Sequence, residues 1–123
     1  MDDYIRHITQ QALSSHNFRE VLETGENMQV VIMSLKPGEE IGSEVHDNTE
    51  QVLICLAGNG KVSIDGKEHE YLDGDMVLVR AGQEHNFINT DDTPMKIISI
   101  YSPPHHKEGL IHRDKAEADN EDG

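Results

Sequence analysis

The sequence predicts a single all-β domain, either a β-sandwich or a small barrel, and three observations support this. The chain has 123 residues, which is the usual length of one domain. From residue 27 onward, short runs rich in valine, isoleucine and leucine alternate with turn sequences that contain glycine, asparagine or aspartate. Seven or eight such runs are present, and this arrangement is typical of antiparallel sandwiches and barrels.

The expected elements follow in chain order. Ile5, Ile8, Ala12 and Leu13 recur at spacings of three and four, so a short amphipathic helix is expected between residues 4 and 13. Strands are expected near residues 28–35, 39–46, 51–56, 61–64, 68–72, 76–79, 86–89 and 95–101. The Asp65-Gly66 pair predicts a two-residue hairpin, because both central positions of such a turn adopt positive φ.

The chain divides into an N-terminal segment (1–27), a barrel (28–104) and an acidic C-terminal tail (105–123). From residue 113 the tail has many charges and only two alanines as apolar side chains, so it is expected to be frayed. The run from Val52 to Leu56 is apolar on both faces of its strand, so both faces need cover. This cover comes either from a second copy of the chain, which predicts a homodimer, or from the N-terminal segment.

Composition excludes several classes of function. Ten basic and 24 acidic residues give a net charge of −14, which argues against binding to nucleic acid or to an anionic membrane surface. The single cysteine, Cys55, excludes a disulfide framework and is expected to be a small buried hydrophobe. The first residues do not resemble a signal peptide, and the longest apolar run, of six residues, cannot span a bilayer. A cytoplasmic protein is therefore expected.

Four polar side chains form a candidate metal site. Glu44 and His46 are two residues apart on an expected strand, so they point to the same face. Gln51 begins the next strand and His85 opens a later one, so all four can converge inside a barrel. A buried polar cluster is costly unless its members are paired or bind an ion. Two imidazoles, one carboxylate and an amide suit a divalent transition metal.

Two segments resemble the sequence motifs of the cupin superfamily. The first motif is a glycine, a histidine, a second histidine, a glutamate and a glycine, separated by five, one, three or four, and six residues. The spacing is matched by Gly38, Glu44, His46, Gln51 and Gly58. The second motif is a glycine, a proline, a glycine, a histidine and an asparagine, separated by five, one, two and three residues. Its spacing is matched by Gly74, Arg80, Gly82, His85 and Asn89. The resemblance covers about residues 28–101. It implies a double-stranded β-helix, a jelly-roll-like barrel, with a metal ion in its lumen.

Three positions depart from these motifs. Glu44 replaces the first histidine, Gln51 replaces the glutamate, and Arg80 replaces a turn proline. The family's three imidazoles and one carboxylate become a two-histidine, one-carboxylate set of Glu44, His46 and His85, the arrangement associated with non-haem iron. Gln51 is then either a fourth ligand or a neighbouring hydrogen-bond donor. Iron, manganese, nickel and zinc all remain open as the metal.

Residues 36–42 and 101–106 also resemble small bacterial cupins that are often labelled mannose-6-phosphate isomerase-like. That label implies a metal-dependent sugar-phosphate isomerase. With the candidate ligand set, a metal-dependent enzyme of the isomerase or dioxygenase type that acts on a small organic molecule in the lumen is expected. The alternative is a non-catalytic module that binds a small ligand or a sugar. His105 and His106 follow two prolines, so they lie either over the barrel mouth or on an exposed loop. The remaining histidines are expected at the surface: His7, His16, His69 and His112.

Overall fold

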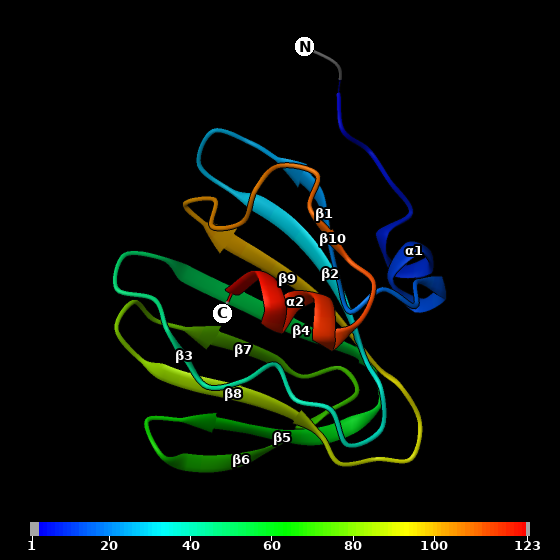
Figure 1. Ribbon diagram of the computed structural model, residues 1–123, viewed down its shortest axis with the longest axis vertical. Coiled ribbons are helices and arrows are strands. Elements are labelled where there is room, and N and C mark those ends of the chain that lie inside the picture. The colour runs from blue at the N-terminus through cyan, green and yellow to red at the C-terminus, as the bar shows by residue number, and fades with distance from the viewer. Residues whose placement is uncertain (1–2, 123) are drawn as a thin grey trace.

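The computed structural model describes residues 3–122, and their strands form two antiparallel sheets (Figure 1). The six-stranded sheet has the order β10-β1-β2-β9-β4-β7, with bounds Ile111–His112, Arg19–Thr24, Gln29–Leu35, Met95–Ser102, Glu50–Ala57 and Met76–Val79. The four-stranded sheet has the order β3-β8-β5-β6, with bounds Glu44–Val45, Glu84–Asn89, Asn59–Ile64 and Lys67–Leu72. The sheets enclose one main core, so the all-β, jelly-roll prediction is confirmed.

The inward side chains change from polar to apolar along the same strands. β4 buries Gln51, Leu53 and Cys55 in turn. The pairing of β4 with β9 sets Gln51 opposite Tyr101 and Cys55 opposite Ile97. Because side chains alternate between the faces of a strand, this register gives the barrel interior one polar end and one apolar end.

The apolar end is closed by aromatic side chains and by close backbone contact. The rings of Tyr71 and Phe87 meet edge to face with centres 5.0 Å apart, and both residues are fully buried. Gly60 lies so close to β8 that a Cβ atom there would be 2.1 Å from the carbonyl oxygen of Ile88. Only glycine fits at this position, so no ligand space is expected at this end.

The predicted N-terminal helix is present as α1 (Ile8–Ser14), a little later in the chain than expected. Its Ala12 packs with Ile32 and Ile98 on the outer face of the six-stranded sheet, in a second apolar cluster that also includes Leu56. Figure 1 shows α1 beside this sheet, away from the four-stranded one. The N-terminal segment therefore covers part of the outer apolar face of β4.

The hairpin prediction is also confirmed. Asp65 and Gly66 have φ values of 49° and 83° and connect β5 to β6. The expected strand over residues 39–46, in contrast, is reduced to β3 and one isolated bridge between Glu40 and Ile88. Gly42 has φ of 108°, a conformation that cannot continue a strand.

The C-terminal segment differs most from expectation. Residues 115–122 form helix α2 (Lys115–Asp122), so the prediction of a frayed tail was wrong for these residues. Asp114 caps the helix by accepting a hydrogen bond from the Glu117 amide (2.9 Å), and Ala118 is buried in the main core. β1 and β10 were not predicted, and His112 on β10 is buried at 2 % exposure, so its expected surface position was also wrong.

None of the helices within residues 3–122 has the length and apolar character needed to cross a membrane.

Candidate metal centre

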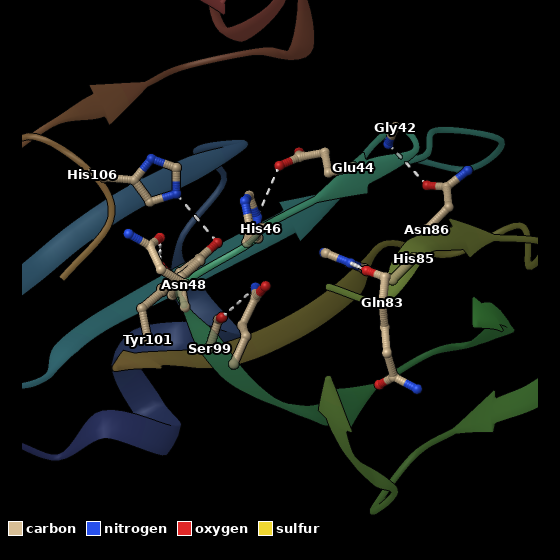
Figure 2. A network of polar contacts seen from close by, with 12 residues as sticks. Gly42, Glu44, His46, Asn48, Gln83, His85, Asn86, Ser99, Tyr101 and His106 are labelled. Atoms are coloured by element: carbon tan, nitrogen blue, oxygen red, sulfur yellow. Dashed lines mark hydrogen bonds and ion pairs between the residues drawn. The ribbon is translucent and has the colours of Figure 1, made fainter. Parts of the chain in front are cut away.

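Carboxylate and imidazole donors meet at the polar end of the barrel interior (Figure 2). Glu44 ends an irregular segment and enters β3, and the Oε2 atom of Glu44 lies 3.1 Å from Nε2 of His46. Glu44, His46 and His105 each offer one donor atom, and these three atoms all lie within 4.8 Å of one another. His105 comes from the loop after β9, so a loop and a barrel edge build this cluster together.

His85 lies on the next strand, directly opposite Glu44 in the pairing of β3 with β8. Its ring centre is 5.2 Å from that of His46, and its side chain is buried. Nδ1 of His85 donates to the Gln83 carbonyl oxygen at 3.0 Å, which leaves Nε2 as the nitrogen with a free lone pair. The structure thus brings His85 beside His46 with its Nε2 available as an acceptor, although His85 is not among the three residues whose donor atoms lie within 4.8 Å of one another.

Gln51 reaches the same end of the interior from β4. Its Nε2 donates to the Ser99 hydroxyl at 2.9 Å. Its Oε1 is buried and has no hydrogen-bond partner among the residues that the structure describes. A buried carbonyl oxygen without a partner is costly, and a cation or a water molecule removes that cost.

The electrostatics keep Glu44 ionised. Burial acts to raise the pKa of Glu44, but the hydrogen bond from His46 and the positive charges of His46 and Arg19 outweigh it, so the pKa lies below its usual value. An ionised carboxylate beside imidazole nitrogens is the protonation state that binds a metal cation.

Tyr101 and His106 form a second polar pair beside His46, and Figure 2 shows it next to Glu44 and His46. Burial raises the pKa of Tyr101 to about 12, and burial together with the charges of Arg19 and His105 lowers the pKa of His106 to about 3. His106 is therefore neutral near pH 7, and the Tyr101 hydroxyl donates to Nε2 of His106 over 3.2 Å.

These residues fit a divalent transition metal. The donors are a carboxylate and imidazoles, which suit iron, manganese, nickel and zinc, and the unpartnered Gln51 oxygen lies at the same end of the barrel. The structure therefore has a possible metal site of one glutamate and two or more histidines, and the identity of the metal is not specified by these donors.

A cavity of about 510 Å³ lies beside this centre. Its walls come from β1, from the segment before β3, from the loop after β9 and from α2. The charged and titratable side chains that line it include Arg19, Glu44, His105, Lys107, Lys115 and Glu121. Glu44 and His105 belong both to the donor cluster and to the cavity wall, so a small molecule in the cavity would reach the metal centre.

Comparison with known proteins assigns the family. The family model described as "Cupin domain" matches residues 31–101, so the chain belongs to the cupin family. It is 40 % identical over 122 residues to YrkC of Bacillus subtilis (strain 168), and this match covers 94 % of the chain and 65 % of YrkC. The chain thus spans about two thirds of that relative.

One solved structure is similar over nearly the whole chain. The crystal structure of BH2720 from Bacillus halodurans superposes with a TM-score of 0.95 at 34 % identity and covers 97 % of this chain and 95 % of BH2720. A more distant relative is mannose-1-phosphate guanylyltransferase of Escherichia coli (strain K12), which is 25 % identical over 92 residues, 75 % of this chain and 19 % of that protein. This similarity fits the expected resemblance to the mannose-6-phosphate isomerase-like group of cupins.

Sequence patterns identified some of these residues and missed others. Strand parity and motif spacing predicted Glu44, His46, Gln51 and His85 as candidate ligands, and the structure places all four at the polar end of the barrel interior. His105 was noted for the two prolines before it but not as a metal donor. Arg19 lies outside both motifs, and no pattern in the sequence marks it.

Proposed function

We propose that this cupin binds one divalent transition metal ion and acts as a metal-dependent enzyme on a small organic molecule. Glu44, His46 and His85 are the proposed ligands, with His105 as a further donor and Gln51 as a fourth ligand or a neighbouring hydrogen-bond donor. The observation that carries this proposal is the meeting of an ionised carboxylate and imidazole nitrogens at the wall of a cavity.

The chain's own residues have distinct roles in this proposal. Bound at this position, the metal ion supplies Lewis-acid polarisation of a substrate oxygen or a site for oxygen chemistry. Gln51 orients a substrate or water oxygen, because its amide is fixed by Ser99. The Tyr101–His106 pair holds a proton beside the centre, with the hydroxyl as donor and the neutral imidazole as acceptor. Isomerisation and dioxygenation are both compatible with these groups.

Metal analysis of the purified protein by mass spectrometry tests the first half of the proposal. About one equivalent per chain is expected for such a donor set. Protein with under a tenth of an equivalent that also fails to bind added Fe(II), Mn(II), Ni(II) or Zn(II) would contradict it. A turnover screen of the iron-loaded protein, with and without oxygen, tests the second half. Metal binding without any turnover would favour a non-catalytic module that binds a small ligand or a sugar.

We further propose that the chain is a cytoplasmic homodimer. α1 covers only part of the outer face of β4, whose Val52 and Ile54 pair with the exposed Leu78 and Met76 on the edge strand β7. This row is apolar and lies in the outer layer, as an interface between two sheets requires. Light scattering at micromolar concentration tests it, with Met76→Glu expected to give monomers. A wild-type monomer at both low and high salt would contradict it.

A further inference from the structure

A buried arginine faces the cavity and has no anionic partner there. Arg19 opens β1, is 2 % exposed and lines the cavity wall. Among the residues that the structure describes, Arg19 forms no ion pair with a carboxylate, and its Nε atom is buried without a hydrogen-bond partner. Its guanidinium also lies over the Phe18 ring, 5.3 Å from the ring centre. A buried charge in this state is costly unless an anion pairs with it.

The hydrogen bond that Arg19 does make brings no carboxylate into direct contact with its guanidinium, and the charge of Glu44 acts on Arg19 only from beyond ion-pair distance. Nη1 of Arg19 lies 3.1 Å from Nδ1 of His112. A guanidinium only donates, so Nδ1 of His112 accepts and the proton of this imidazole is on Nε2. Nε2 then donates to Oε2 of Glu121 on α2 at 2.9 Å. The neutral imidazole separates Arg19 from Glu121, so the carboxylate fixes the position of His112 without pairing with the arginine.

The other acidic groups of the cavity already have partners. Glu44 is bonded to His46 and Glu121 to His112. Asp119 accepts a hydrogen bond from Lys115 at 2.8 Å. The three cations of the wall, Arg19, Lys107 and Lys115, equal its three carboxylates in number, but Arg19 and Lys107 have no carboxylate within ion-pair distance among residues 3–122.

We propose that Arg19 binds the anionic group, a carboxylate or a phosphate, of the small molecule that enters this cavity. The planar guanidinium presents donors in the geometry that carboxylate and phosphate oxygens accept. Because Glu44 and His105 line the same cavity, a molecule held by Arg19 extends toward the metal centre. The direction of the bound molecule rests on the proposed function, whereas the anion site itself does not require the metal.

Calorimetric titration of the metal-free protein with inorganic phosphate and, separately, with acetate tests the anion site. At least one of the two probes is expected to bind, and Arg19→Gln is expected to weaken that binding by about tenfold or more. Lys61→Gln is the matched control, since it removes the same charge from an exposed side chain on β5, outside the cavity, and is expected to leave affinity unchanged. Binding of phosphate alone or of acetate alone would assign the anionic group.

A measurement on the wild-type chain covers the case in which Arg19→Gln does not fold. Titration of either probe is expected to shift one arginine Nε–H resonance in the nitrogen-15 spectrum, and Arg19→Lys should lack that signal. Failure of both probes to bind, or equal affinity of Arg19→Gln and wild type, would overturn the proposal. If the metal-free protein binds the anion through Arg19 while no metal binds, the anion site stands and the proposed enzyme function fails.

Discussion

The two ends of the barrel interior are built by the same strands and hold opposite kinds of side chain. On β8, His85 lies at the polar end and Phe87, two residues later, lies at the apolar end. On β9, Tyr101 and Ser99 give way to Ile97 and Met95. The polar end opens to a cavity, and the apolar end is filled by the Tyr71–Phe87 pair and closed by Gly60.

This difference separates stability from chemistry within one core. At the apolar end the contact between the Tyr71 and Phe87 rings and the close approach of Gly60 to β8 leave no space for a ligand. At the polar end the unpartnered atoms of Gln51 and Arg19 remain, whereas at the apolar end the Tyr71 hydroxyl is the unpartnered buried atom among the described residues. Substitutions at the two ends are therefore expected to affect different measurements, and five predictions test this separation.

The largest expected effect is loss of stability at the apolar end. Phe87→Ala should lower the free energy of unfolding by about 3–5 kcal/mol, because it removes a fully buried ring and leaves a cavity. Urea unfolding of the metal-free protein measures this, with Leu72→Ala as a control at a partly exposed site, for which a change within about 0.5 kcal/mol is expected. Metal affinity should stay unchanged in the folded variant. A large loss of metal affinity would show that the two ends are coupled.

The thiol of Cys55 should react very slowly in the native protein. Burial raises the pKa of Cys55 to about 11. At about pH 8 only about one thiol in a thousand is then ionised, against about a quarter for an ordinary cysteine. Because the thiolate fraction rises with pH up to the pKa, the alkylation rate should rise about tenfold per pH unit from 8 to 10. Equal rates in native and urea-unfolded protein at pH 8 would contradict the closed apolar end.

At the polar end, His46→Ala should abolish tight metal binding. A loss of more than about 100-fold is expected, because outer partners of a metal site already contribute about 10–100-fold. His85→Ala should cause a similar loss, and His69→Ala is the matched control, since His69 is exposed on β6. Competition with a chromophoric chelator measures the affinities. If His105→Ala has a larger effect than His85→Ala, the third ligand comes from the loop after β9.

Metal affinity should fall as the pH is lowered from about 8 to about 5, because protons compete with the metal for the imidazole nitrogens. Glu44 should not contribute to this loss, since its pKa is held below the usual value and its carboxylate stays ionised over this range. The slope of affinity against pH therefore counts histidine ligands. A flat profile would mean that no histidine binds the metal.

The smallest expected effect concerns Gln51. Gln51→Ala should weaken metal binding by less than about tenfold, because a neutral amide is a poor donor. Gln51→Glu should tighten it, since a carboxylate adds a negative charge where the unpartnered oxygen now lies. The same chelator competition separates the two variants. A loss in Gln51→Ala equal to that in His46→Ala would make the amide a principal ligand.

The barrel was predictable because its signals are local and repeated. Alternating apolar runs, and turns such as Asp65-Gly66, specified most of the strands from residue 28 to residue 101. β1 was missed because Arg19, Glu20 and Glu23 interrupt its apolar pattern, and the charge of the buried Arg19 is accommodated by a contact with the distant His112. A strand whose charged residues are stabilised by distant partners carries no clear periodic signal.

The candidate site was predictable only where it belongs to the barrel. Glu44, Gln51 and His85 lie on three different strands and His46 just after β3, and strand parity together with the two family motifs predicted that they converge. α2 was missed because its composition is highly charged, although Asp114 caps it and the Glu117 side chain accepts from the Arg113 amide. Whether this short helix docks depends on the burial of Ala118 and on the His112–Glu121 contact. Such contacts join residues far apart in the chain, so a local pattern does not contain them.

The cavity wall has a consequence for how this protein changes over evolution. Most of its charged lining residues, including Arg19, Lys107, Lys115 and Glu121, come from the two ends of the chain, whereas the barrel strands between them supply the packing. Exposed loops and terminal elements tolerate substitution far better than a filled core. New ligand preferences can therefore arise by altering the chain ends while the barrel and its metal donors stay constant. A library restricted to Lys107, Lys115 and Asp119 would explore recognition with little risk to folding.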